Sequence, residues 1–247
     1  FKEAFEKTKI AGSIAAGALD EVSKIIKPGI STAEIDKICY EFINDNKAYS
    51  APLFYRGFPK SCCTSPNHVV CHGIPSEKIL KEGDIVNVDV TAFKDGWHGD
   101  TSRMFNIGEI SIKAEKLIKT TYESMMKAIS IVKNGIFLGD IGSTIQKHVE
   151  DQGFSVVQDF CGHGIGETFH KEPNVLHYGE KGTGEKIKTG MIFTIEPMIN
   201  LGNYETKTLK DGWTAVTKDK SLSAQFEHTI GVTKDSCEIF TQLDKTN

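Results

Sequence analysis

Apolar side chains recur with the 3.6-residue period of an amphipathic helix in residues 2–26 and again in residues 112–133. A glycine-containing turn and a second, shorter helical pattern follow each of these segments, over residues 31–43 in the first case and 140–149 in the second. The same order of patterns at two places in the chain predicts two similar halves, each beginning with a pair of helices.

The starts of the two shorter helices carry their own signals. Ser31 and Glu34 have the spacing of a capping box, in which each side chain bonds the backbone of the other residue. In the second half Asp140 directly precedes the apolar positions, which begin at Ile141. We therefore expect the Asp140 carboxylate to cap that helix.

Strand patterns also occur twice. EGDIVNVDV (82–90) matches TGMIFTIEP (189–197), and FKDGW (93–97) is echoed by LKDGW (209–213). Asp-Gly between β-prone stretches is a strong hairpin signal. Each half reads helix, helix, strand, turn, strand, which predicts an α+β fold with antiparallel sheet inside and helices outside. We expect one domain over residues 1–247, with halves at roughly 1–108 and 109–247.

Composition then excludes several classes of protein. The 247 residues are 39% apolar and 25% charged, as in ordinary globular proteins. With 33 acidic and 29 basic residues the net charge is −4, so no basic excess points to nucleic acid or to an anionic membrane surface. No apolar run reaches the ~20 residues that span a bilayer. The six cysteines form no CxxC pair and the first residues are not a signal peptide, so we expect reduced thiols in a cytoplasmic protein.

Four acidic residues hold matched positions in the two hairpins. Asp89 and Asp100 lie almost equally far from the first turn, and Glu196 and Glu227 are centred on the second. Antiparallel pairing is then expected to set the members of each pair opposite one another. Their strands are too apolar for a solvated surface, and burying such charges alone costs on the order of several kcal/mol per ion. Two divalent cations would cancel the charge, so the pattern predicts a dinuclear metal site.

Three of the eight histidines stand out by their neighbours. The tripeptide HGI occurs in both halves, at His72 and at His163, and His170 follows in ETFHKEP. The flanking glycines permit the close backbone approach that a metal or a substrate requires. One imidazole among oxygen donors suits Mn, Fe(II), Co or Zn better than Ca or Mg. The Gly-rich CGHGIG lacks the ending of a phosphate-binding loop. Packing or surface roles are expected for the other histidines, which are His68, His98, His148, His177 and His228.

With these residues in place, the sequence strongly resembles the type I (bacterial-type) methionine aminopeptidases. The matching strings are KPGISTAEID, NHVVCHGIP, IVNVDVTAFKDGWHGDTSRMF, FSVVQDFCGHGIGETFHKEPNVLHYG, FTIEPMI and KDGWTAVTKDKSLSAQFEHTI, which together cover nearly the whole chain. The resemblance implies the pita-bread fold, whose two pseudo-symmetric halves agree with the internal repeat.

The resemblance also implies residue roles. Metal ligands fall on Asp89, Asp100, His163, Glu196 and Glu227, of which Asp100 and Glu227 would bridge two ions. His72 and His170 match catalytic histidines that contact the substrate, and Glu196 would carry the proton to the leaving amine. The methionine pocket maps onto Tyr55, Phe58, Cys63, Phe169 and Trp213. The chain departs from some relatives at the pocket rim, where they have Cys in place of Pro52 and His in place of Arg56.

The implied activity is removal of the N-terminal (initiator) methionine from nascent proteins and peptides, with preference for a small second residue. Hydroxide activated by two divalent ions (Co, Mn, Fe(II) or Zn) would attack the first peptide carbonyl. N-terminal Met peptides and nascent chains would be the partners, the ribosome is a further candidate, and we expect a monomer. Three alternatives stay open: an X-Pro aminopeptidase or prolidase, which generally carries an extra N-terminal domain; a type II enzyme, which needs an insertion; and a non-catalytic binding protein, which typically loses ligands.

Overall fold

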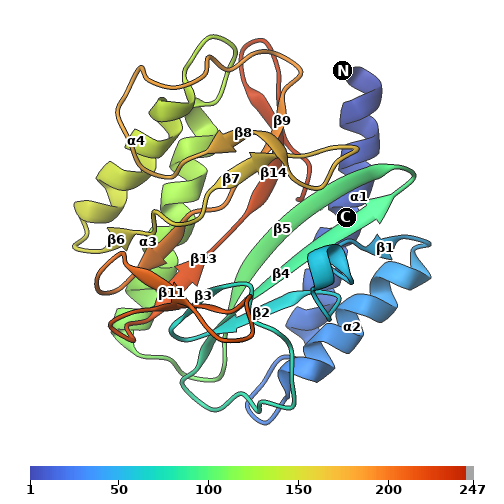
Figure 1. The fold of residues 1–247 in the computed structure, drawn as a ribbon, viewed down its shortest axis with the longest axis vertical. Helices are drawn as coiled ribbons and strands as arrows, with labels where there is room; N and C mark the ends of the chain where they lie inside the picture. The colour runs from blue at the N-terminus through green and yellow to red at the C-terminus, as the bar shows by residue number, and fades with distance from the viewer. Residues whose placement is uncertain (243–247) are drawn as a thin grey trace.

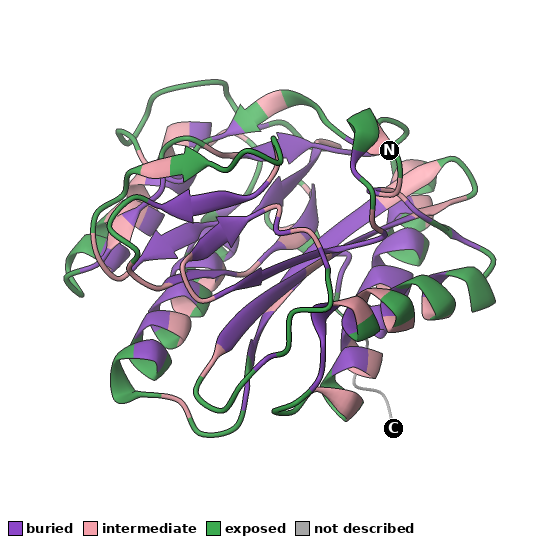
Figure 2. Cartoon of the chain, turned by 60° about the horizontal axis from the view of Figure 1, so that its bottom comes forward, coloured by how far each residue is buried: buried purple, intermediate pink, exposed green. Residues whose placement is uncertain are grey.

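Two pairs of helices flank a central set of antiparallel sheets in this computed structural model, which describes residues 1–242 (Figure 1). The strands between the helix pairs are largely buried, and the outward faces of the helices are exposed (Figure 2). The predicted α+β arrangement, with antiparallel sheet inside and helices outside, is confirmed. Within the described part of the chain no helix is long and apolar enough to cross a membrane.

The first half is built around one long hairpin. Its helices are α1 (Lys2–Ile25), α2 (Thr32–Asp45) and the short 3-10 helix η1 (Tyr55–Gly57). Its strands are β1 (Tyr49–Ser50), β2 (Cys63–Pro66), β3 (Val69–Cys71), β4 (Ile85–Lys94) and β5 (Trp97–Asn106). Strand β4 is central, because it pairs with β1 and β2 and, along its whole length, with β5.

The apolar faces of α1 and α2 form the first core against β4. Every second residue of β4 faces this core, and the helices contribute side chains at helical spacing; the fully buried members include Leu19, Val22, Ile35, Ile43, Val86, Val88 and Val90. The predicted capping box starts α2, since the Ser31 backbone N–H donates to Glu34 (2.7 Å) and the Glu34 N–H donates to the Ser31 hydroxyl (3.2 Å).

Helix α1 lies so close to β5 that both contact positions are glycine. A Cβ on Gly99 would overlap the backbone of Gly12. We expect Gly99→Ala to lower the free energy of unfolding by about 1–3 kcal/mol, measured by urea denaturation, because backbone cannot move aside as a side chain can. Gly17→Ala in the same helix is the control: its Cβ would meet the edge of the Phe42 ring, and alanine favours the helix by about 1 kcal/mol. Equal losses in both variants would contradict the prediction.

The second half repeats the helix pair but divides its strands more finely than predicted. Its helices are α3 (Ile112–Ile131) and α4 (Leu138–Glu150). Its strands are β6 (Ser155–Val156), β7 (Gly162–Gly164), β8 (Lys171–Val175), β9 (Ile192–Ile195), β10 (Met198–Asn200), β11 (Thr206–Thr208), β12 (Ala215–Thr217), β13 (Ser223–Gln225), β14 (His228–Val232) and β15 (Cys237–Ile239). They form a five-stranded sheet, β15-β14-β9-β7-β8, and two smaller ones, β13-β10-β6 and β11-β12-β3.

Helix α4 begins earlier than predicted. Phe137 is its N-cap residue, and Asp140 is the third helical residue, whose carboxylate accepts a hydrogen bond from the Phe137 N–H (2.8 Å). The expectation that Asp140 is the cap was therefore wrong. The acid acts from inside the first turn, as Glu34 does in α2, so the two helix starts resemble each other more closely than the sequence indicated.

Strands β5 and β14 join the two halves. Ser102 and Glu227 form an antiparallel bridge. The Thr229 hydroxyl accepts a hydrogen bond from the Asp100 N–H (3.0 Å) and donates one to the Asp100 carbonyl (2.7 Å). This junction holds an acid of the first half, Asp100, beside an acid of the second, Glu227.

Candidate metal centre and active site

The first hairpin places Asp89 and Asp100 on one face, but two residues out of register. Asp95 and Gly96 form its turn, so Asp89 pairs with Ser102, and Asp100 pairs with Thr91. The expectation that the two acids are directly opposed was wrong, because the turn is centred one residue later than predicted. A shift of two positions preserves the face of the sheet, so the acids remain diagonal neighbours.

Glu196 and Glu227 oppose each other at a break in the sheet. Strand β9 ends just before Glu196, and β14 begins just after Glu227. The β9–β14 pairing and the β10–β13 pairing lie on either side of this break and share one register, centred on Asp211–Gly212 as predicted. The β11–β12 pairing around the LKDGW turn keeps this register, so the three pairings follow one long hairpin that is interrupted between the strands.

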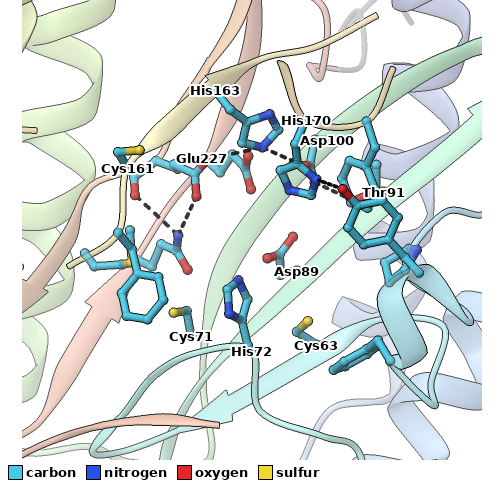
Figure 3. Close-up of a pocket in the computed structure, with 18 of the residues that line it drawn as sticks. Cys63, Cys71, His72, Asp89, Thr91, Asp100, Cys161, His163, His170 and Glu227 are labelled. Atoms are coloured by element: carbon cyan, nitrogen blue, oxygen red, sulfur yellow. Dashed lines mark hydrogen bonds and ion pairs between the residues drawn. The ribbon is translucent and has the colours of Figure 1, made fainter. Parts of the chain in front are cut away.

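Strand β7 adds an imidazole to these acids (Figure 3). Asp100, His163 and Glu227 are buried, and each offers one ligand atom within 4.8 Å of the other two. Nε2 of His163 also lies 3.5 Å from Oε1 of Glu196. The Asp89 side chain lines the same cavity as these residues. All five predicted donors therefore converge on one place.

The glycines on either side of His163 pack against protein backbone. A Cβ on Gly162 would overlap the Thr194 carbonyl of β9, and one on Gly164 would overlap the Glu172 carbonyl of β8. Protein packing alone accounts for both glycines, since backbone occupies the space that a Cβ would take. They let β7 fit between its two neighbouring strands, which fixes where the His163 ring points.

Burial opposes the ionisation of three of the four carboxyl groups. Burial, reinforced by the charge of Asp100, raises the pKa values of Asp89 and Glu227 well above their usual range. Burial also raises the pKa of Glu196 to about 7. Desolvation alone would lower the pKa of His163, but Asp100 and Glu196 outweigh it and raise that pKa. Four like charges this close require compensation by positive charge.

No lysine or arginine of residues 1–242 pairs with these acids. Arg103, the cationic residue nearest Asp100 in sequence, pairs with Asp20 instead (2.8 Å). Oε1 of Glu227 is buried and makes no hydrogen bond within the described residues. An unpartnered carboxylate oxygen among three further acids favours a bound cation, and oxygen donors with one imidazole suit Mn, Fe(II), Co or Zn. The residues present therefore fit divalent metal.

Neighbouring hydroxyl and amide groups hold two of the acids in place. The Thr91 hydroxyl donates to Oδ1 of Asp100 (2.7 Å), and the Thr194 hydroxyl donates to Oε1 of Glu196 (2.7 Å). The side-chain amide of Gln225 donates to Oε2 of Glu196 (3.3 Å). The sequence analysis did not single out these residues. The signal for Thr91 was its place two residues from Asp89, on the same face of β4.

His177 also contacts the site, although only a packing or surface role was expected for it. Its ring is fully buried, and Nε2 accepts a hydrogen bond from the Glu196 N–H (3.1 Å). Burial lowers the pKa of His177 to about 3, which keeps the ring neutral and able to accept this bond. His177 therefore supports the backbone at the break that holds Glu196, a role that no local sequence pattern indicated.

The donors line a cavity of about 660 Å³. Its walls include every other residue that the resemblance assigned to the site, namely Tyr55, Phe58, Cys63, His72, Phe169, His170 and Trp213, together with the two departures, Pro52 and Arg56. The wall residues that were not predicted include Cys71, Phe160 and Met198. An apolar wall with a few convergent polar groups is typical of a small-ligand site.

Two histidines present neutral rings to this cavity. His72 has a left-handed backbone (φ 56°), and its ring meets Phe160 edge-on, with 5.4 Å between centroids. Burial lowers the pKa of His72. Desolvation in the cavity, with the positive charge of His163 when protonated, lowers the pKa of His170 to about 4. Both rings are therefore neutral at pH 7, with one N–H donor each.

Comparison with known proteins gives matches along almost the entire chain. Residues 6–234 match metallopeptidase family M24. The chain is 57% identical to a methionine aminopeptidase of Rickettsia prowazekii, over 98% of this chain and 93% of that protein. It is 56% identical to a methionine aminopeptidase of Escherichia coli K12, over 97% and 91%. The crystal structure of the methionine aminopeptidase from Rickettsia prowazekii matches with a TM-score of 0.97 over 98% of both chains.

A more distant likeness shows how widely the fold is shared. Prolidase from Pyrococcus furiosus matches with a TM-score of 0.79 at 21% identity, and this chain covers 65% of that protein. That likeness concerns the fold alone. The sequence identity to the two methionine aminopeptidases is much higher, at 57% and 56%. The chain therefore belongs to metallopeptidase family M24, has its pita-bread fold, and is a member of the bacterial-type methionine aminopeptidases within it.

Proposed function

We propose that this protein removes the N-terminal methionine from nascent proteins and peptides and prefers a small second residue. One observation carries the proposal: four acids and one histidine converge at the wall of a cavity that also holds two neutral histidines and an apolar pocket. The relatives named above are methionine aminopeptidases, which agrees with this reading.

The charges of the four acidic residues favour the binding of two divalent ions. Asp89, Asp100, Glu196 and Glu227 carry −4 when ionised, which two such ions balance. These acids and His163 would hold the ions. When bound, the ions supply the positive charge that lowers the pKa of water and polarises a peptide carbonyl.

The neutral histidines act on the substrate. His170 donates a hydrogen bond to the oxygen of the first peptide carbonyl, where negative charge develops during hydrolysis. His72, on the other side of the cavity, steadies the tetrahedral intermediate, where negative charge develops, or the amide of the second residue. Glu196 moves the proton to the leaving amine, and its bonds to Thr194 and Gln225 keep its carboxylate oriented for this transfer.

The methionine side chain is expected among aromatic rings and a thiol. Tyr55 packs on Phe169 (4.8 Å between ring centroids), and Phe58 meets Trp213 edge-on (5.2 Å). Cys63 adds a buried sulfur. Such walls suit a flexible, polarisable thioether better than a charged or branched side chain.

The remaining assignments follow from this activity. Initiator methionine is exposed where proteins are made, so the enzyme acts in the cytoplasm, on chains that emerge from the ribosome. We propose one catalytic domain over residues 1–247. All five metal-binding residues come from one chain, so a monomer suffices.

Hydrolysis of Met-Ala-Ser with added manganese or cobalt tests the proposal. We expect free methionine, and release slower by at least about tenfold when a bulky residue replaces the alanine, a difference of about 1.4 kcal/mol. Turnover of X-Pro peptides alone would favour the prolidase alternative. No turnover with any metal would favour a non-catalytic binding protein.

A further inference from the structure

The Tyr55 hydroxyl makes a hydrogen bond with a histidine ring at the cavity wall. Its oxygen lies 3.0 Å from Nδ1 of His170. Tyr55 belongs to η1 in the first half, whereas His170 directly precedes β8 in the second. We propose that this hydroxyl is a positioning group that fixes the tautomer and the orientation of His170, so that its Nε2–H faces the substrate. The inference rests on the function proposed above and assigns Tyr55 a task beyond lining the methionine pocket.

The direction of this hydrogen bond decides what His170 offers to the cavity. A neutral imidazole has one N–H donor and one acceptor nitrogen. If the phenol donates to Nδ1, the proton of His170 lies on Nε2, and the ring presents a donor. If Nδ1–H donates to the phenol, Nε2 presents only a lone pair. Only the first arrangement lets His170 stabilise an oxygen that gains negative charge.

Chemistry and the local charges favour the phenol as donor. A phenol O–H is a stronger hydrogen-bond donor than the N–H of a neutral imidazole, and the bare imidazole nitrogen is a stronger acceptor than a phenol oxygen. The Arg56 guanidinium lies over the Tyr55 ring, 5.3 Å from its centroid. A cation there withdraws electron density, which strengthens the O–H as a donor and weakens the oxygen as an acceptor.

The neighbouring aromatic rings fix the plane of the His170 ring, and the hydrogen bond to Tyr55 determines which edge of the ring faces the cavity. Phe169 stacks on His170 at 4.0 Å between centroids, and His98 stacks on the far side of Phe169 at 5.5 Å. Stacking fixes the plane of a ring but does not distinguish its edges. Within residues 1–242, the side-chain hydrogen bond of His170 is the one between its Nδ1 and the Tyr55 hydroxyl. This bond therefore sets which nitrogen faces the cavity.

The backbone around Tyr55 is held in an unfavourable conformation. Phe54 and Arg56 on either side have positive φ values of 65° and 49°. Phe54 is 78% exposed, an unusual position for a phenylalanine. Non-glycine residues adopt this region at a cost, and such strain gathers at functional positions. Here it accompanies a half-buried Tyr55 between two exposed neighbours.

Tyr55→Phe removes the hydroxyl and keeps the ring in the pocket. We expect kcat for Met-Ala-Ser to fall about tenfold, with KM and metal content within about twofold of wild type. In a His170→Ala background the same change is expected to alter kcat by less than about twofold, since its target is gone. Tyr178→Phe, which removes a hydroxyl outside the cavity, serves as the matched control and should change nothing. A rise in KM alone, or equal losses in both backgrounds, would overturn the proposal.

Nitrogen NMR of histidine-labelled, metal-free protein gives a readout independent of activity. Wild type is expected to show His170 with its proton on Nε2, and Tyr55→Phe a mixture of both tautomers. A proton on Nδ1 in wild type, or an unchanged spectrum in the variant, would refute the positioning role. Failure of wild type to cleave Met-Ala-Ser would count against the proposed function instead, because the NMR result does not depend on it.

Discussion

Removal of divalent metal by a chelator is expected to abolish hydrolysis of Met-Ala-Ser and to destabilise the fold more at about pH 8 than at about pH 5. Burial raises the pKa values of Asp89 and Glu227 well above their usual range, and that of Glu196 to about 7. A carboxyl whose pKa is raised by folding binds more protons in the folded chain than in the unfolded one. The free energy of unfolding of the metal-free protein therefore falls as pH rises above about 4, where unfolded carboxyls ionise.

Thermal unfolding with and without manganese, across this pH range, measures the effect. Asp89→Asn is the informative companion, because it removes one charge while nearly preserving shape. At about pH 8 the variant should be more stable than wild type without metal, yet gain less stability from manganese. A metal-free wild type whose melting temperature rises with pH would show that the acids are already compensated by the protein.

The sequence predicts the framework of this fold well, because its signals are local. The capping box of Ser31 and Glu34 and the two helix pairs depend on residues close in the chain, and the structure contains them. The register of Asp89 and Asp100 was predicted wrongly because one residue of uncertainty in the turn moves the pairing by two. The short strands β6 to β8 have too few residues to show a period.

In the candidate site, too, the residues marked by local sequence patterns were predicted, and those that act through contacts with distant residues were not. The five proposed donors could be found because acids and an imidazole in apolar or glycine-rich segments are unusual there. His177 and Tyr55 could not be placed by such reasoning. The partner of His177 is the Glu196 backbone, 19 residues away, and Tyr55 meets a ring 115 residues away. The first contact forms when the strands of the second half pack together, and the second exists only after the two halves have packed on each other.

The matching HGI tripeptides show that sequence equivalence does not fix chemical role. His163 lies in β7 with its Nε2 3.6 Å from Oδ2 of Asp100. His72 follows β3 in a left-handed conformation and lines the cavity beside Phe160 and Trp213. In the proposed mechanism, one position of the pseudo-repeat would offer an imidazole to a metal and the other would offer it to a substrate.

His72→Ala is accordingly expected to lower kcat about 10²–10³-fold, with bound metal unchanged, since removal of one donor aimed at developing charge typically has that effect. His72→Asn separates the loss of the ring from backbone strain, because asparagine tolerates the positive φ of 56° that His72 adopts. Both variants should keep the melting temperature and the manganese content of wild type.

His163→Ala is the opposite case and completes the test. This ring lies 3.5–3.6 Å from two acids of the cluster, so its loss should remove metal and activity together. Metal analysis beside steady-state kinetics then distinguishes the two histidines of the repeat. If His72→Ala lost metal in the same proportion as kcat, His72 would belong with the ligands. The division of labour between the halves would then have to be abandoned.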